Sequence, residues 1–175
     1  YAIVITTNAG LWRYKIGDTV RFTSTDPYRI KVTGRTKHHI NVFGEELIIE
    51  NAETALRKAS QLTNAEIVDY TAAPIFMNGK EKGAHEWIIE FKLPPDDLQS
   101  FTKLLDTALQ EVNSDYEAKR FNNTTLNAPK IHHARERLFY DWLKEKNKLG
   151  GQHKVPRLSN TRDYLEELLT LNRSF

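Results

Sequence analysis

The stretch after Pro94-Pro95-Asp96 constrains the fold of this chain more than any other part of the sequence. Apolar side chains recur there every three or four residues, and this rhythm places them on one face of an α-helix. The face consists of Leu98, Phe101, Leu104, Leu105, Ala108, Leu109 and Val112. Because such a face is buried against another layer of secondary structure, we expect this helix to pack on a sheet or on further helices.

The segments around this helix predict the other layers. Residues 65–70 and 85–92, on either side of a Gly-containing loop at 78–83, predict two strands. Further strands are predicted at 40–43, 46–49 and 130–134, and further helices at 52–59, 114–121, 138–146 and 161–171, the first of them capped by Asn51. Strands and helices alternate from about residue 37 onward, so the fold class that we expect is α+β.

Residues 1–36 predict β structure alone. Ile3-Val4-Ile5 is an apolar, β-branched run, and a second strand at 11–15 is expected to end at Gly17-Asp18. Shorter strands are predicted at 19–23 and 28–33, with a turn at 25–27 between them. The sequence begins inside the first strand, with neither an initiator methionine nor the regions of a signal peptide, so we expect that residue 1 is not the natural start.

Composition argues against several classes of function. The 175 residues are 39% hydrophobic and 27% charged, which is ordinary for about one globular domain and part of a second. The absence of cysteine excludes disulfides, cysteine nucleophiles and thiolate metal sites, and it fits the reducing cytoplasm in which we expect the protein to act. A net charge of +2 without a basic stripe argues against nucleic acid, and no apolar run approaches the roughly 18 residues of a membrane span.

Two Gly-containing dipeptides near the start carry candidate binding residues. Asp18 follows Gly17 at an expected turn, where its carboxylate either bonds its own backbone or accepts the hydroxyls of a ribose. Arg35 follows Gly34, and its guanidinium is either an ordinary surface group or a donor of paired hydrogen bonds to phosphate or ribose oxygens. Tyr14 is either a core residue or a ring beside the nucleotide.

Lys154 is the candidate catalytic residue. It lies between Gly150-Gly151, which makes the preceding loop mobile, and Pro156, which stiffens the chain beyond it. An ammonium delivered by such a loop can offset charge that develops on a reacting carboxylate and an α-phosphate. The alternative is a solvated loop lysine.

Two histidine pairs, His38-His39 and His132-His133, are weak candidates for metal ligands. Neighbouring residues on a strand point to opposite faces, and the carboxylates nearby lack ligand spacing. We therefore expect no metal site built from the chain itself.

The order of these motifs resembles that of the acyl-adenylate-forming enzymes, the superfamily of acyl-CoA synthetases and luciferase. Residues 12–18 resemble the Tyr-Arg-x-Gly-Asp motif of that superfamily, and Gly34-Arg35 followed by Gly44-Glu45-Glu46-Leu47 is similar to its hinge motif. Thr6-Thr7-x-x-Gly10-Leu11-x-Arg13-Tyr14 and Gln152-x-Lys154-x-Pro156-Arg157 narrow the resemblance to the auxin-responsive acyl-acid amido synthetases, and we expect a bacterial member.

The resemblance implies a division of the chain and a missing partner domain. Residues 1–36 would be the terminal β segment of a large, ATP-binding, adenylate-forming domain, and residues 37–175 its small, mobile α+β C-terminal domain. The rest of the large domain would lie upstream in the same enzyme. The chain would therefore be inactive on its own.

The resemblance also implies roles for single residues. Asp18 would bind the ribose hydroxyls of ATP, and Tyr14 would flank that site. Arg35 would hold the ribose or phosphate of the adenylate. Lys37 would be the hinge about which the small domain rotates, and Lys154 would be the mobile lysine that reaches the adenylation centre.

The implied activity is that of an ATP-dependent acid–amino acid ligase, with ATP as cosubstrate and Mg²⁺ delivered with it. A carboxylic acid would be adenylated, and an amine of an amino acid would then take the acyl group. Glu46 departs from the pattern, because many members have arginine there, and the hairpin at 43–46 differs from that of plant members. Two alternatives remain: an acyl-CoA synthetase that uses the same adenylate, and a non-catalytic module that kept the fold.

Overall fold

The computed structural model describes residues 1–36, 38–79, 81–150 and 154–173, and it has the α+β fold that the sequence predicts. In chain order the strands and helices are β1 (Ala2–Ile5), β2 (Tyr14–Thr25), β3 (Tyr28–Arg35), β4 (His39–Ile40), β5 (Leu47–Ile48), α1 (Ile49–Thr63), β6 (Glu66–Ile75), β7 (Ala84–Leu93), α2 (Leu98–Val112), α3 (Ser114–Arg120), β8 (Lys130–Ala134), α4 (Leu138–Glu145) and α5 (Asp163–Arg173). A short 3₁₀ turn, η1 (Phe121–Asn123), follows α3.

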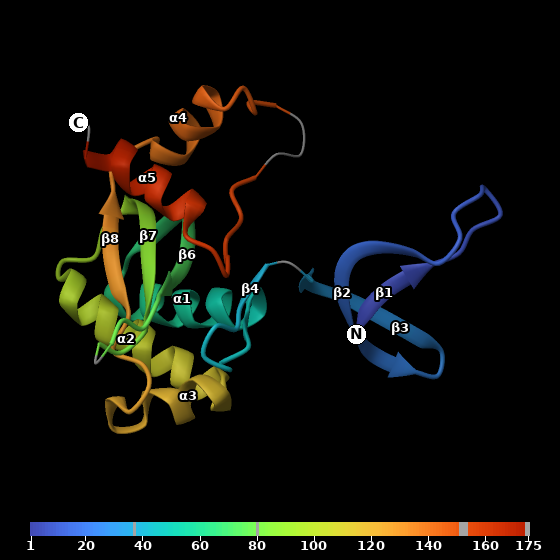
Figure 1. Cartoon of the computed structure of the whole chain (residues 1–175), viewed down its shortest axis with the longest axis horizontal. Helices are drawn as coiled ribbons and strands as arrows, with labels where there is room; N and C mark the ends of the chain where they lie inside the picture. Colours follow the sequence, from blue (N-terminus) through green and yellow to red (C-terminus); the bar gives the residue numbers. More distant parts are fainter. Residues whose placement is uncertain (37, 80, 151–153, 174–175) are drawn as a thin grey trace.

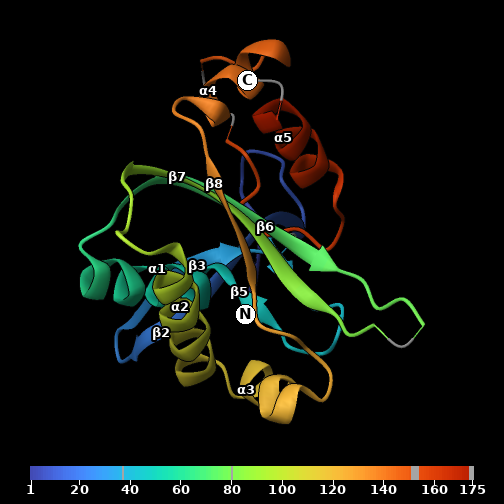
Figure 2. The ribbon, with the colours of Figure 1, turned by 90° about the vertical axis from the view of Figure 1, so that its left-hand side faces the viewer.

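The larger part of the molecule is built around a sheet with the strand order β6-β7-β8 (Figure 1). β6 and β7 are antiparallel, whereas β7 and β8 run parallel. Successive side chains of a strand point to opposite faces, so Trp87 and Ile89 pack with α1 and α2, while Ile88 packs with α4 and α5. Figure 2 shows these two pairs of helices on opposite sides of the sheet.

The helix with the clearest periodicity is confirmed as α2. Its apolar face includes Phe101, Leu105 and Leu109, all fully buried against the sheet and α1. Asp97 caps its first turn, because its side chain accepts the backbone N–H groups of Gln99 and Ser100, each at 3.0 Å. Among the described residues, no helix is both long and apolar enough to cross a bilayer.

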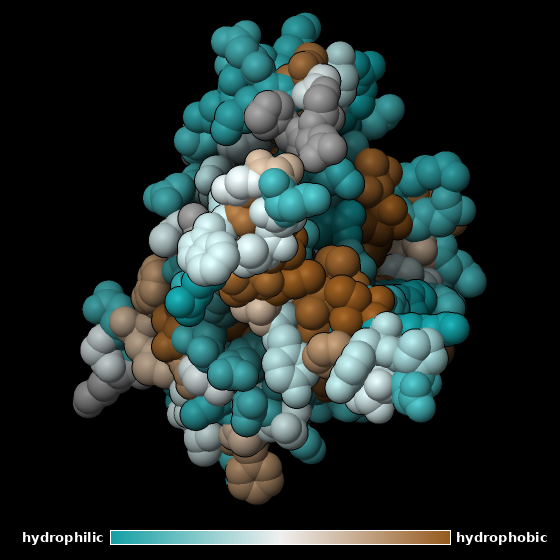
Figure 3. Space-filling model, turned by 90° about the vertical axis from the view of Figure 1, so that its right-hand side faces the viewer, coloured by the Kyte–Doolittle hydropathy of each residue, from teal (hydrophilic) through white to brown (hydrophobic). Residues whose placement is uncertain are grey.

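A second sheet, with the order β1-β2-β3, lies apart from the first and joins it through the connection around residue 37 (Figure 1). Both strand pairs are antiparallel. Apolar side chains of this sheet remain exposed, and brown surface gathers on this side of the molecule in Figure 3. They include Val4, Ile16, Phe22, Ile30 and Val32. Exposed apolar side chains that gather on a surface are typical of sites that contact protein, a membrane or a ligand.

The predicted end of the second strand at Gly17-Asp18 is wrong. β2 continues without a break from Tyr14 to Thr25. Instead of a turn, the glycine marks a bulge: two β1 residues that are two apart pair with β2 residues that are four apart. Gly17 takes a φ of +90°, a conformation that costs glycine little because it has no Cβ. β2 can therefore accommodate the extra residues of the bulge without ending there.

The predicted hairpin after residue 37 is present in a shorter form, as the antiparallel pair β4 and β5. Asn51 does not cap the helix that follows, as the sequence suggested, because the helix begins at Ile49 and Asn51 lies within its first turn. Its side chain still accepts the backbone N–H of Ile48 at 3.3 Å. It therefore satisfies a backbone group at the helix start from inside the helix.

Candidate functional site

The predicted nucleotide-binding residues Asp18 and Arg35 occupy directly opposed positions on β2 and β3. Opposed Cα atoms of antiparallel strands are about 5 Å apart. Asp18 lies just after the Gly17 bulge and is partly buried. The side chain of Arg35 lies outside the described part of the structure. The fold therefore brings the two backbone positions together at the end of the β2–β3 pair.

Tyr14 begins β2 and is 52% exposed, so it is not a core residue of this chain. It pairs with Ile5 at the edge of the β1–β2 ladder, next to the exposed Trp12. An aromatic ring at this position is open to contact with a ligand or with another part of a protein.

The connection between the two sheets is short. Thr36 still belongs to the β1–β3 sheet, because its backbone N–H donates to the carbonyl of Gly17 at 2.8 Å. His39 already pairs with Ile48 in the second part of the molecule. Lys37, the predicted hinge, lies between these anchors but outside the described residues. The sheet also contacts the start of α1, where Arg21 lies 3.4 Å from the carboxylate of Glu50.

The hairpin that carries Gly44-Glu45-Glu46 is held from inside by a buried carboxylate–imidazole pair. Glu45 and His85 are both fully covered, and Glu45 Oε1 lies 2.9 Å from His85 Nε2. Glu45 Oε2 also accepts the backbone N–H of Phe43 at 2.7 Å. Burial acts to raise the pKa of Glu45, but the hydrogen bonds from His85 and the backbone outweigh it and hold the pKa below its usual value.

Close packing adds to this anchor. The ring of Phe43 lies directly on Gly83, where a Cβ would come within 2.4 Å of the ring. Asn113, at the start of α3, donates from its side chain to the Glu45 carbonyl at 2.8 Å. The hairpin is therefore fixed to the body of the domain. Sequence reasoning missed the pairing of His85 with Glu45, because the two residues lie 40 positions apart in the sequence.

Lys154 begins a segment, residues 154–160, that we call the strap. The strap runs parallel to β6 and pairs with it at a single bridge between Ala72 and Leu158. The backbone N–H of Ala72 donates to the carbonyl of Arg157 at 2.9 Å, and that of Ser159 donates to the carbonyl of Ala72 at 3.1 Å. Lys154 itself is exposed.

The strap also reaches the hairpin. The side-chain oxygen of Asn160 accepts the backbone N–H of Asn41 at 2.8 Å. The glycine-rich part of the predicted mobile loop, including Gln152 of the motif, lies outside the described residues. On its C-terminal side, Lys154 is thus followed by a segment fixed to both β6 and the hairpin.

The histidine pair in β8 has two separate roles. His132 Nε2 lies 2.7 Å from Glu86 Oε1, whereas the ring of His133 meets Phe91 edge-on at 5.3 Å between centroids. Within the part of the chain that the structure describes, no group of three or more His, Asp or Glu side chains is placed to hold a metal ion.

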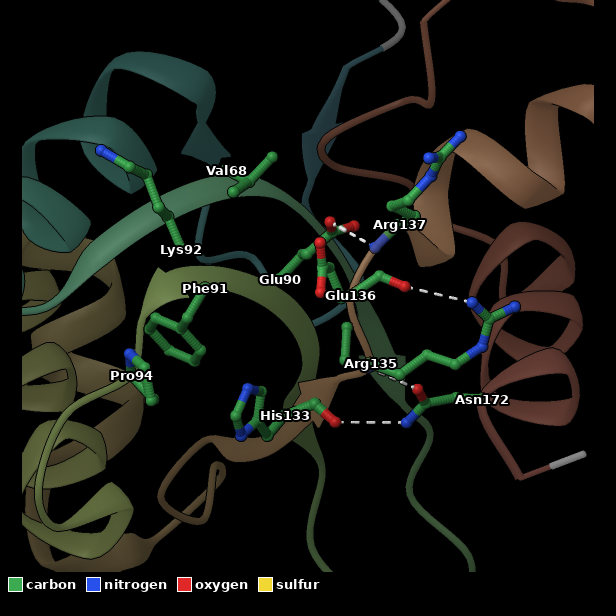
Figure 4. Close-up of a pocket in the computed structure, with 11 residues that line it drawn as sticks. Val68, Glu90, Phe91, Lys92, Pro94, His133, Arg135, Glu136, Arg137 and Asn172 are labelled. Atoms are coloured by element: carbon green, nitrogen blue, oxygen red, sulfur yellow. Dashed lines mark hydrogen bonds between the residues drawn. The ribbon is translucent and has the colours of Figure 1, made fainter. Parts of the chain in front are cut away.

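A pocket of about 860 Å³ opens beside the ends of β7 and β8 (Figure 4). Its polar groups largely serve the fold. Glu90 accepts the backbone N–H of Arg137 at 2.7 Å, at the start of α4. Asn172 bonds the carbonyl of His133 and the N–H of Arg135, and so satisfies part of the edge of β8. None of the predicted site residues lines this pocket.

The predicted site is therefore divided between two parts of the chain. Asp18 and Arg35 belong to the β1–β3 sheet, whereas Lys154 begins the strap, which pairs with β6 through Leu158. Figure 1 shows the β1–β3 sheet apart from β6. Such an arrangement suits a site that is completed by the movement of one part against the other.

Two domains of one protein family match separate parts of this chain. The GH3 family C-terminal domain matches residues 50–163, and the GH3 family central domain matches residues 1–35, ending where β3 ends. None of the curated proteins matches the sequence significantly.

Two solved structures match nearly the whole chain. One, described as GH3.15 acyl acid amido synthetase, has a TM-score of 0.76 and 19% identity over 99% of this chain and 32% of its own. The other, AtGH3.15 acyl acid amido synthetase in complex with 2,4-DB, has a TM-score of 0.74 and 19% identity over 97% of this chain and 32% of its own. The chain thus shares their fold and spans about a third of their length. With its C-terminal domain matched over most of the sequence, the chain belongs to the GH3 family.

Proposed function

We propose that this chain is the C-terminal portion of an ATP-dependent acid–amino acid ligase of the AMP-forming type. The observation that carries the proposal is the placement of Asp18 opposite Arg35 at the junction of the two GH3 family domains. Two solved structures that share the fold are described as acyl acid amido synthetases, which supports this reaction class. The absence of cysteine fits a cytoplasmic enzyme.

An upstream domain is part of the proposal. The chain spans about a third of the related structures, and the exposed apolar face of its β1–β3 sheet is suited to pack against further protein. Residues 1–36 would complete that upstream domain, and residues 37–175 would form the mobile domain. Since the binding loop for the phosphates and the pocket for the acid would lie upstream, the chain alone would be inactive.

The proposed reaction has two steps. In the first, a carboxylate oxygen of the acid attacks the α-phosphorus of ATP, and pyrophosphate leaves. In the second, the amine of an amino acid attacks the acyl carbon, loses a proton and displaces AMP. Mg²⁺ would arrive with ATP and be held mostly by phosphates and water.

Each site residue has a role in this scheme. Asp18 would accept the ribose hydroxyls, Arg35 would donate to ribose or phosphate, and Tyr14 would flank the nucleotide. Lys154 would place its ammonium against the charge that develops on the α-phosphate during the first step. Rotation between Thr36 and His39, near Lys37, would carry Lys154 toward and away from the nucleotide between the steps.

The test uses the complete enzyme and follows carboxylate-dependent release of pyrophosphate. Asp18→Ala and Lys154→Ala should each lower the rate by about 10²-fold or more, as expected when a positioned electrostatic group is removed. Lys58→Ala is the control, because it removes only an exposed ion pair with Glu111 at 2.7 Å. Near-normal rates in both site variants would refute the assignment.

The acceptor is tested separately. Incubation with ATP, an acid, CoA and a mixture of amino acids should give an amide and AMP. A thioester as the main product would identify an acyl-CoA synthetase instead. Failure of the complete enzyme to bind ATP would indicate a non-catalytic module that kept the fold.

A further inference from the structure

The side chain of Arg157 connects the strap to two other elements. Its guanidinium forms an ion pair with Glu53 of α1 and lies over the ring of Tyr70 in β6, 5.1 Å from the ring centroid. Its Nε atom is 3.9 Å from the carboxylate of Asp69. One planar group thus contacts an aromatic face and two carboxylates, an arrangement that arginine makes and lysine does not reproduce.

The charge of Lys154 acts on one of these carboxylates, that of Asp69. Burial raises the pKa of Asp69, and the neighbouring backbone N–H together with the charges of Arg157 and Lys154 partly offsets that rise. The Asp69 side chain is only 33% exposed, so solvent screens these charges less than it does on an open surface. If Arg157 were absent, the ammonium of Lys154 would be the nearest cation of the strap to replace it beside Asp69.

Among the described residues, the backbone of the strap is anchored after Lys154 but not at Lys154 itself, so competition between Lys154 and Arg157 for Asp69 can move the lysine. Arg157 is held to β6 through its own carbonyl, and the hydroxyl of Thr71 donates to the carbonyl of Pro156 at 2.6 Å. Lys154 precedes these anchors by two residues and is exposed. Its position therefore depends on how firmly the start of the strap is held and on which charges attract its ammonium.

We infer that Arg157 is a positioning residue for Lys154: it clamps the strap to β6 and α1 and occupies the carboxylates of Glu53 and Asp69, so that the Lys154 ammonium stays available to the adenylate. This role rests on the function proposed for Lys154. Arg157 itself contacts neither the substrate nor the reacting atoms.

The kinetic test compares the two half-reactions of the complete enzyme. Arg157→Ala should lower kcat for pyrophosphate release about 10-fold or more, since a small displacement of a catalytic group is costly, while the KM for ATP stays within about twofold. Amide formation from a synthetic acyl-adenylate should stay close to wild type, which also shows that the variant is folded. The rate of pyrophosphate release in Arg157→Lys should lie between those of Arg157→Ala and the wild type. Lys58→Ala should match the wild type.

A second substitution tests the competition for charge. Adding Asp69→Asn to Arg157→Ala removes the carboxylate that would hold Lys154, while its side-chain oxygen can still accept the Tyr70 N–H that Asp69 accepts at 2.9 Å. The double variant should recover adenylation several-fold over Arg157→Ala. A purely structural role for Arg157 predicts no recovery, because the double variant lacks even more of the native contacts.

The outcomes separate this inference from the proposed function. If Lys154→Ala lowers adenylation and Arg157→Ala does not, the positioning role is refuted and the function stands. An equal loss in both half-reactions, or no recovery in the double variant, also refutes the positioning role. If Lys154→Ala adenylates normally, the catalytic assignment of Lys154 falls and the role of Arg157 falls with it.

Discussion

Asp18 in β2 and Arg35 in β3 stand directly opposite each other, at the point where the β2–β3 ladder ends. The bulge at Gly17 immediately precedes Asp18, and Thr36 binds the Gly17 carbonyl with both its N–H and its hydroxyl. The two residues predicted to bind the nucleotide therefore lie on the same end of the β2–β3 pair, next to the connection around residue 37.

This placement predicts coupling between the two residues. In the complete enzyme, Asp18→Ala and Arg35→Ala should each weaken ATP binding, and the double variant should lose less than the sum of the two losses, because neighbouring residues that bind one ligand are not additive. Isothermal titration with ATP measures all three. Arg29→Ala, on the same strand but paired with Ser24, is the control. Strict additivity would mean that the two residues do not share a ligand.

The buried pair of Glu45 and His85 predicts a large loss of stability when one partner is removed. His85→Leu should lower the free energy of unfolding by about 3–5 kcal/mol, because the Glu45 carboxylate would stay buried without its main side-chain donor. Urea unfolding at neutral pH measures this. Glu45→Leu combined with His85→Leu should cost less than the sum of the single changes, and Lys58→Ala should cost little. A loss for His85→Leu as small as that for Lys58→Ala would contradict the prediction.

Glu86 predicts how stability depends on pH. Burial acts to raise its pKa, but hydrogen bonds from Lys130, His132 and Arg162 outweigh burial and lower the pKa to about 2 from an ordinary value of 4.5. Because the folded-state pKa is the lower one, the unfolded chain binds the proton more readily. The stabilisation is therefore complete above pH 4.5 and is lost as the pH falls toward 2. It amounts to about 3 kcal/mol for a shift of this size.

The measurement is urea unfolding between pH 2 and 7 with Glu86→Gln as the comparison. The glutamine variant should be less stable at neutral pH and should lose less stability on acidification, since its side chain does not titrate. Its free energy of unfolding should approach that of the wild type as the pH nears 2. An unchanged acid slope would show that other carboxylates account for the acid sensitivity.

The contact of Phe43 with Gly83 predicts a steric effect that a second change relieves. Gly83→Ala would place a Cβ at 2.4 Å from the Phe43 ring, and overpacking of this kind costs about 1–3 kcal/mol. Phe43→Leu in the same chain removes the edge of the ring that clashes, so the double variant should be more stable than Gly83→Ala alone. Thermal unfolding of the three variants tests this. A fully tolerated Gly83→Ala would mean that the hairpin is not held against β7.

Local patterns predicted most of the elements because the forces behind them are local. The spacing of apolar residues in α2 follows directly from burial of one helix face, and α2 begins and ends where the periodicity does. The same reasoning failed at Gly17-Asp18, where glycine is compatible both with a turn and with a bulge. Pairing with β1 and β3, which lie elsewhere in the sequence, selects the bulge.

The sequence by itself determined the α+β class, most helix and strand positions and, through the order of its motifs, a resemblance to a family to which the chain does belong. The tertiary structure decided which residues come together: the backbone positions of Asp18 and Arg35 across β2 and β3, the side chains of Glu45 and His85, and the side chains of Arg157 and Tyr70. The two side-chain pairs join segments far apart in the chain, and hydrophobic periodicity carries no information about such contacts. They exist only once packed helices and paired strands have brought those segments within reach of a hydrogen bond or an ion pair.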